Sequence, residues 1–204
     1  MNVSRRRVLV GSLSLLTLAG CDRFSLGSKA PTFNSTDITG AEFARRLELP
    51  DVDGQPRTLA DWKGKVTVVF FGYTQCPDVC PTTMADLAAI RKSLGADGDK
   101  LQSVFVTIDP ERDKPELLSA YVGAFDPSFL GLYGDAEATA RTAKEFKIIY
   151  QKQPGRTPDT YTMDHSAGTF VFDPAGRLRL YVGHGQDAEL FEHDLRELLR
   201  SAQG

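Results

Sequence analysis

The sequence lacks an excess of basic charge, a long apolar run and any internal repeat. Its 204 residues carry 24 basic and 27 acidic side chains, and no basic stripe is interleaved with aromatic residues. This charge balance argues against nucleic acid as a partner. With no repeat and no low-complexity tract, one globular domain is the default for a chain of this length.

Cysteine and histidine are scarce, with three of the former and three of the latter. Any metal or redox site built from cysteine and histidine must therefore use some of these six side chains. The complete set is Cys21, Cys76, Cys80, His165, His184 and His193.

Residues 1–20 are typical of a bacterial lipoprotein signal peptide. Three arginines, residues 5–7, precede an apolar stretch over residues 8–18 that is too short to span a bilayer as a helix. The stretch ends in Leu18-Ala19-Gly20-Cys21, which resembles the lipobox, where the cysteine is lipidated and becomes the first mature residue. We therefore expect lipid on Cys21, a tether over residues 21–32 and a domain over residues 33–204.

The same segment carries signals for export. Ser4-Arg5-Arg6-Arg7-Val8-Leu9 is similar to a twin-arginine signal, but Sec signals are basic too, so both routes stay open. Asp22 resembles the signal that keeps some lipoproteins in the inner membrane. We expect a protein of the bacterial cell envelope, lipid-anchored on the periplasmic side of the inner membrane. In that oxidising compartment Cys76 and Cys80 must be paired, metal-bound or kept reduced.

Strand-like and helix-like segments alternate along the rest of the chain. Residues 66–71 are continuously apolar, which predicts a central strand buried on both faces. A helix is expected from Val79 towards Leu94 and a second strand over residues 101–108, so the crossover between the strands is parallel. Further helices are predicted over residues 115–124, 135–146 and 188–201, and a short edge strand over residues 147–151.

Two hairpins complete the predicted α/β fold. The first spans residues 47–59 and turns at Asp53-Gly54, and the second spans residues 169–182 with an Asp-Pro-x-Gly turn. Two βα units followed by a hairpin and a last helix make a thioredoxin-like fold. We expect a central mixed sheet flanked by helices, with an extra N-terminal hairpin.

The segment Cys76-Pro77-Asp78-Val79-Cys80 lies between the first strand and its helix. Two cysteines four residues apart share one face if both fall in the first helical turn, and Asp78 is a suitable N-cap. The free backbone N–H groups and the helix dipole then favour thiolates. We expect a reactive pair there.

Several roles compete for this pair. A structural disulfide would close only a tiny loop, which stabilises little. Dithiol–disulfide exchange is the usual task of a thioredoxin-like motif, although those motifs have two intervening residues and this one has three. Metal binding needs a further ligand. Cys80-Pro81-Thr82 faintly resembles a peroxiredoxin nucleophile, but the threonine expected three residues earlier is Pro77.

His165 is the candidate for the further ligand. It lies in residues 161–168, which correspond to the turn that faces the redox motif in a thioredoxin-like fold. Thioredoxins usually place a cis-proline in that turn, but residues 161–168 of this chain contain no proline. His193 falls on the charged side of the last helix and His184 in a glycine-flanked loop, so we expect neither to be a ligand. Two thiolates and one imidazole suit Cu(I) and can also hold Cu(II).

Three motifs together resemble the Sco (SenC) family of copper-chaperone proteins. They are Phe71-Gly72-Tyr73-Thr74-Gln75-Cys76-Pro77-Asp78-Val79-Cys80-Pro81, Thr107-Ile108-Asp109-Pro110-Glu111-Arg112-Asp113 and Asp164-His165-Ser166. The resemblance implies a thioredoxin-like fold with added N-terminal elements. It also implies copper held by Cys76, Cys80 and His165.

The resemblance further implies a function. Proteins of this family deliver copper to the binuclear copper site of cytochrome c oxidase, or reduce the cysteines that receive it. The expected partners are the copper-bearing oxidase subunit and other copper chaperones or thiol reductases. Whether the chain is an enzyme stays open, since a metal-independent thiol–disulfide reductase is the alternative. The chain departs from the family at Tyr73 and Gln75, where phenylalanine and histidine are common.

Two aspartates are candidates for supporting the ligands. Asp109 follows the second strand, at the end of the sheet where the cysteines are expected, and either orients a ligand or merely ends the strand. Asp164 precedes His165 and could orient it, tune its basicity or meet a partner.

Overall fold

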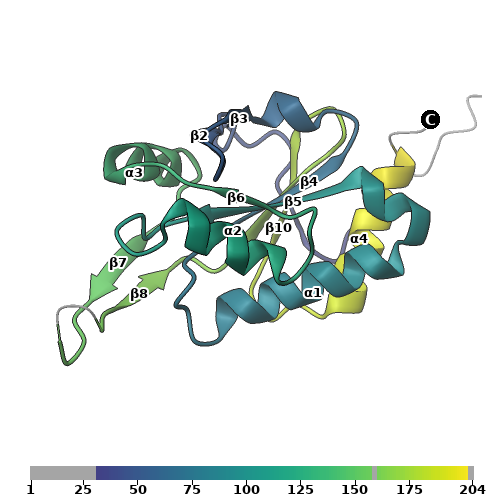
Figure 1. The fold of residues 1–204 in the computed structure, drawn as a ribbon. Helices are drawn as coiled ribbons and strands as arrows, with labels where there is room; N and C mark the ends of the chain where they lie inside the picture. The colour runs from purple at the N-terminus through teal and green to yellow at the C-terminus, as the bar shows by residue number, and fades with distance from the viewer. Residues whose placement is uncertain (1–30, 158–159, 202–204) are drawn as a thin grey trace, which may run out of the picture. The chain divides into compact units, whose positions relative to one another are not determined.

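A six-stranded mixed sheet forms the centre of the computed structural model, which describes residues 31–157 and 160–201 (Figure 1). The strand order is β1-β10-β9-β4-β5-β6. The bounds are β1 Thr36–Asp37, β4 Val66–Gly72, β5 Leu101–Thr107, β6 Leu130–Leu132, β9 Thr169–Phe172 and β10 Leu178–Val182. The predicted signal peptide and Cys21 lie outside the described residues.

Strand β4 lies in the interior of the sheet. It pairs in parallel with β5 and antiparallel with β9, and all seven of its residues are buried. This confirms the prediction of a central strand, because an unbroken apolar run can be buried on both faces. The register places Gly72 opposite Thr107, so β4 and β5 end at the same edge of the sheet.

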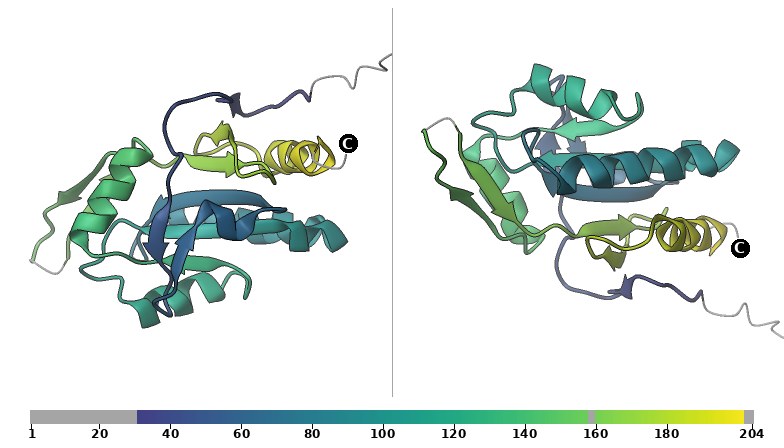
Figure 2. Two further views of the ribbon diagram at one scale, coloured as in Figure 1. Left: turned by 90° about the horizontal axis from the view of Figure 1, so that it is seen from above. Right: turned by 90° about the horizontal axis from the view of Figure 1, so that it is seen from below.

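Four α-helices and two 3₁₀-helices accompany the sheet in the described part of the chain. They are α1 Val79–Ser93, α2 Pro115–Gly123, α3 Ala136–Glu145, α4 Ala188–Ser201, η1 Leu59–Trp62 and η2 Gly95–Lys100. Figures 1 and 2 show α1 and α4 side by side, while α2 packs on β6 and α3 contacts β2. Among the described residues, none of the helices combines the length and apolarity that crossing a membrane requires.

Two antiparallel hairpins lie outside the central sheet. The first pairs β2 Glu48–Pro50 with β3 Pro56–Thr58, and its turn uses Gly54 at a φ of 79°. The second pairs β7 Tyr150–Gln153 with β8 Thr162–His165 and projects from the body of the fold (Figure 1). The first confirms the predicted N-terminal hairpin, and the whole confirms the thioredoxin-like α/β fold.

The β7–β8 hairpin differs from two predictions. Residues 147–151 were expected to form an edge strand, but β7 begins at Tyr150 and pairs with β8 rather than with the sheet. Residues 161–168 were expected to be a turn, but Thr162–His165 is a strand with His165 as its last residue. Both segments are short and largely polar, so their periodicity carries little signal. The short strands β1 and β6 were not predicted either.

A buried carboxylate on α4 holds the chain that leads into β1. The Asp194 side chain is fully buried and accepts hydrogen bonds from the Asn34 N–H at 2.9 Å, the Ser35 N–H at 2.8 Å and the Ser35 hydroxyl at 2.6 Å. Burial alone would raise the pKa of Asp194, but the hydrogen bonds from Ser35 and Asn34 outweigh it and lower the pKa below 3.8. The ionised form therefore stabilises the folded chain.

Asp194→Asn should lower the free energy of unfolding by about 2 to 3 kcal/mol at neutral pH, because a neutral amide cannot accept all these bonds. Since the folded-state pKa lies below the ordinary 3.8, the difference from wild type should be full above that pH and shrink as the pH falls through the folded-state value. Urea unfolding at several pH values measures it. Asp53→Asn, on the exposed hairpin turn, is the control. An equal loss in both variants would contradict the assignment.

Candidate metal centre

The two cysteines flank the start of α1. Cys80 is the second residue of the helix and is buried, whereas Cys76 lies in the preceding loop and is partly exposed. The condition under which the two cysteines would share one helical face, that both fall in the first turn, is therefore not met. Asp78 occupies the N-cap position, but its side chain accepts no capping hydrogen bond. Instead the Cys80 N–H donates to the Cys76 Sγ at 3.4 Å, so the sulfur serves one of the free donors at this helix end.

A buried carboxylate anchors the loop that carries Cys76. Asp113 is fully buried and accepts from the Thr74 N–H at 3.0 Å, the Thr74 hydroxyl at 2.6 Å and the Thr107 hydroxyl at 2.7 Å. Burial raises the pKa of Asp113, and the hydrogen bonds from Thr74 and Thr107 offset only part of that effect. Asp113 thus ties the cysteine loop to the end of β5.

His165 reaches the cysteines from the end of β8. A backbone carbonyl can only accept, so the Nδ1–H of His165 donates to the Ser166 carbonyl at 3.0 Å. Nε2 is therefore the acceptor nitrogen, and the Cys80 thiol donates to it with an Sγ–Nε2 distance of 3.7 Å. The rings of Phe70 and Tyr73 meet the imidazole edge to face, with centroids 6.3 and 6.0 Å away.

The three predicted ligands come together in one cluster. The donor atoms of Cys76, Cys80 and His165 all lie within 4.8 Å of one another, and this is the one such group of three or more His, Cys, Asp or Glu side chains in the described part of the chain. The other two histidines lie elsewhere: His184 is exposed in the loop after β10, and His193 lies on α4 near Asp194.

The cluster opens to solvent through a pocket of about 470 Å³. Cys76 and His165 line this pocket together with residues of the cysteine loop and of β8. Two sulfurs and one imidazole nitrogen form a soft donor set, and soft metal ions prefer such ligands. The arrangement can therefore hold a thiophilic metal ion that enters from the side of Cys76.

Burial sets the protonation of the cluster. It raises the pKa of the Cys80 thiol well above its ordinary range, and the neighbouring Cys76 side chain raises it further. The expectation of a thiolate favoured by the helix N-terminus is therefore wrong for Cys80, because desolvation outweighs the helix dipole. Burial lowers the pKa of His165, against the opposing effect of its bond to Ser166, and so favours the neutral imidazole. A metal ion binding here must displace the Cys80 proton.

Gly72 makes room for the buried sulfur. A Cβ at this last position of β4 would lie 2.8 Å from the Cys80 Sγ and 2.9 Å from the Phe105 ring. Both distances are shorter than van der Waals contact. Only glycine lets Cys80 sit directly against the central strand.

In the described part of the chain, neither candidate aspartate hydrogen-bonds a donor atom of the cluster, but Asp164 lines the same pocket and its charge raises the pKa of His165 against the effect of burial. Asp109 is buried, pairs with Arg112 and accepts from the Tyr161 hydroxyl at 2.7 Å. Asp164 is exposed and accepts from the Gln153 amide at 2.7 Å, while the Nδ1 of His165 binds the Ser166 carbonyl.

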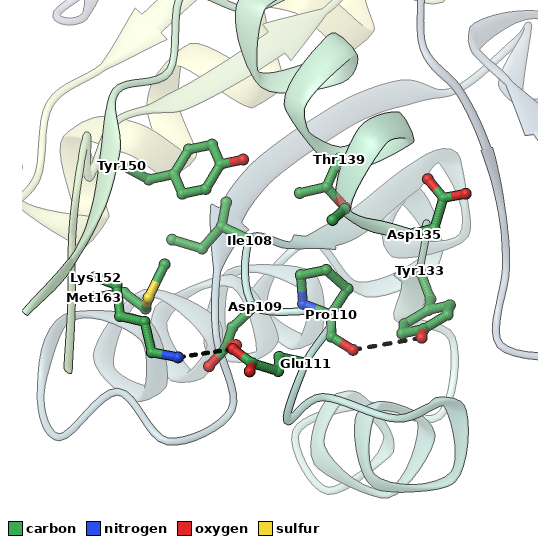
Figure 3. Close-up of a pocket in the computed structure, with 11 residues that line it drawn as sticks. Ile108, Asp109, Pro110, Glu111, Tyr133, Asp135, Thr139, Tyr150, Lys152 and Met163 are labelled. Atoms are coloured by element: carbon green, nitrogen blue, oxygen red, sulfur yellow. Dashed lines mark hydrogen bonds and ion pairs between the residues drawn. The ribbon is translucent and has the colours of Figure 1, made fainter. Parts of the chain in front are cut away.

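A second cavity, of about 420 Å³, lies next to the metal pocket and shares Met163 with it (Figure 3). Its lining combines carboxylates with tyrosines, and Lys152 spans it to pair with Glu111 at 2.8 Å. Asp109 and Glu111 reach the cavity from the β5–α2 loop, whereas Lys152 lies on β7.

Comparison with known proteins identifies related chains. The family model described as SCO1/SenC matches residues 35–200. The mitochondrial SCO2 homolog of Mus musculus is 35% identical over 152 residues, which are 74% of this chain and 60% of the mouse protein. The chain thus spans about 60% of the length of that relative.

Solved structures of similar chains include metal-bound and metal-free forms. ScoI of Bradyrhizobium japonicum with copper bound is 36% identical, with a TM-score of 0.69 over 76% of this chain and 98% of that chain. Apo Sco1 of Thermus thermophilus is 39% identical, with a TM-score of 0.73 over 82% of this chain and 98% of that chain.

Gly72→Ala should lower the free energy of unfolding by about 1 to 3 kcal/mol, because the added methyl group overpacks Cys80 and Phe105. Chemical denaturation measures the loss. Gly123→Ala is the matched control, since a Cβ there meets open space. Equal stability of the Gly72→Ala variant and wild type would show that the sulfur does not need this space.

Proposed function

The chain belongs to the SCO1/SenC family, and from this membership we propose that it is a copper metallochaperone whose ligands are Cys76, Cys80 and His165. The observation that carries the proposal is the convergence of the three donor atoms within 4.8 Å. Thiolates select Cu(I), and a set of two cysteines and one histidine can also hold Cu(II). Copper is the cargo of the protein.

The residues around the ligands prepare them for this cargo. The bond from the His165 Nδ1 to the Ser166 carbonyl presents Nε2 to the metal. Binding replaces the proton of the buried Cys80 thiol by a metal–sulfur bond, and that proton leaves to solvent. Cys76 is partly exposed, so it is the sulfur at which copper can enter and at which a recipient can meet it.

The recipient we propose is the copper-bearing subunit of cytochrome c oxidase. This follows from the sequence resemblance to the Sco family and from the solvent-facing side of the site. We also propose that Cys21 carries lipid and that residues 21–32 tether the domain to the periplasmic side of the inner membrane. Cys21→Ser, which removes the lipid acceptor, then moves the protein from the membrane fraction to the soluble fraction.

The reduced protein should bind one equivalent of Cu(I), and His165→Ala should weaken that binding by more than the roughly 10- to 100-fold that loss of an outer-shell partner costs. Competition with a chromogenic Cu(I) chelator measures the affinity. His184→Ala is the control, because His184 is exposed and lies outside the cluster. Unchanged binding by His165→Ala would overturn the proposed ligand set.

A second candidate function is reduction of the oxidase cysteines without metal. The specific observation for it is that Cys76 and Cys80 are both free thiols with their sulfurs within 4.8 Å. In this reaction the Cys76 thiolate attacks a partner disulfide and forms a mixed disulfide. Cys80 then loses its proton to the departing partner thiolate as its sulfur attacks Cys76, so the partner gains two electrons and leaves with both sulfurs reduced, while this protein ends as a disulfide.

His165→Ala also separates the two functions. Thiol–disulfide exchange uses only the sulfurs, so this variant should still reduce a disulfide in the isolated copper-bearing domain of the oxidase subunit, as followed by thiol counting. It should fail to deliver copper to the reduced domain, as followed by the visible absorption of the copper site. A variant that restores full oxidase assembly in cells without binding copper would favour the reductase.

A further inference from the structure

Arg112 lies in the loop between β5 and α2 and has an unusual set of partners. Its side chain is 12% exposed and forms an ion pair with Asp109, which is 3% exposed. A buried ion pair of this kind costs desolvation, and one that is retained often fixes a specific arrangement. The remaining contacts of the guanidinium show which arrangement this one fixes.

The guanidinium bridges the two segments that bring the ligands. Its Nη1 donates to the Gln75 side-chain oxygen at 3.2 Å, in the residue before Cys76. The same nitrogen donates to the Tyr161 carbonyl at 2.8 Å, in the residue before β8. Arg112 is therefore in contact with the cysteine loop, with the start of the histidine strand and with the end of β5.

Tyr161 is held on both faces and at its hydroxyl. Arg112 and Lys152 each place a cationic atom 3.6 Å from the centroid of the Tyr161 ring. The hydroxyl donates towards Asp109 at 2.7 Å and Glu111 at 3.2 Å. Cation–π contacts and charge-assisted hydrogen bonds thus fix this residue, and with it the strand that ends at His165.

This bridge matters because the strand that carries His165 is not part of the central sheet. Strand β8 pairs with β7 in a separate two-stranded ribbon, and the chain enters the central sheet only at Thr169, which pairs with Phe70 of β4. The ladder therefore holds one end of β8, and side-chain contacts between the start of β8 and the loops hold the other. Arg112 supplies such a contact: its side chain hydrogen-bonds both Gln75, in the cysteine loop, and Tyr161, directly before β8.

We propose that Arg112 is the positioning residue of the copper site, which sets the separation of His165 from the two cysteines without touching the metal. The inference rests on the proposed copper site. A planar guanidinium can bind Asp109, Gln75 and the Tyr161 carbonyl while it stacks on an aromatic ring, and a lysine ammonium cannot reproduce that fork.

The test compares two arginines replaced by lysine. Arg112→Lys keeps a positive charge beside Asp109, so the buried carboxylate stays compensated. Arg179→Lys is the matched control: Arg179 is 15% exposed, pairs with the 3% exposed Asp173 and lies 5.6 Å from the Phe33 ring centroid, on β10 and away from the cluster. Affinity for Cu(I) is measured by chelator competition. The Cu(II) form is examined by electron paramagnetic resonance, whose copper hyperfine splitting reports ligand geometry.

Arg112→Lys should weaken Cu(I) binding by roughly 10- to 100-fold and change the Cu(II) hyperfine splitting, while Arg179→Lys leaves both as in wild type. Gln75→Ala adds a second arm, because it removes one contact of Arg112 and leaves the ion pair intact. In a double-mutant cycle the effects of Gln75→Ala and Arg112→Lys on affinity should be less than additive.

The outcomes separate the inference from its premise. If wild type binds no copper, the proposed function fails and the inference with it. If wild type binds copper and Arg112→Lys matches it in affinity and spectrum, the inference alone is overturned. The inference is also overturned if Arg112→Lys and Arg179→Lys lose Cu(I) affinity equally and both lower the free energy of unfolding in urea by the same amount. The loss of affinity would then come from general destabilisation.

Discussion

The approach of the His165 Nε2 to the Cys80 Sγ, at 3.7 Å across 85 residues of sequence, is the contact on which the site depends. One partner follows the central strand of the sheet and the other ends a two-stranded ribbon outside it. Loop anchors on both sides make the approach possible. Asp113 connects the cysteine loop to the end of β5. Tyr161, directly before β8, connects the ribbon to Asp109 in the β5–α2 loop. The β5–α2 loop thus serves both halves of the site.

Burial gives the site its chemical character. The Cys80 sulfur lies against Gly72 in the core, where a negative charge is poorly solvated, so its thiol holds its proton until a cation replaces it. Cys76 has access to solvent, and the imidazole is kept neutral. A soft cation that binds three such donors gains ligands without leaving a buried charge uncompensated. The same two sulfurs are close enough for redox exchange, so one geometry serves both chemistries.

Much of the fold, and the grouping of Cys76, Cys80 and His165, could be predicted from sequence. The signals for the strand and the cysteine pair are local, whereas His165 is singled out through the expected fold and the family resemblance. The unbroken apolarity of residues 66–71 marks the central strand, and the spacing of Cys76 and Cys80 marks a site at the following helix. The supporting contacts could not be predicted, because they join residues far apart in the chain. Arg112 and Asp113 lie within a recognised motif, but the neighbouring sequence does not indicate their partners. Arg112 hydrogen-bonds Tyr161, and Asp113 hydrogen-bonds Thr74. The high pKa of Cys80 was missed for a related reason: helix position is visible in the sequence, whereas depth of burial is a property of the packed core.

The two halves of the cluster lie on different parts of the fold, and this has a consequence for the proposed delivery of copper. Cys80 is fully buried, and its sulfur lies against Gly72 at the end of the central strand. The imidazole sits on a projecting ribbon whose backbone pairs only within itself among the described residues. If copper is held and delivered as proposed, a partner that binds the ribbon would act on the His165 ligand first. Release would then require movement of the ribbon and not unfolding of the domain.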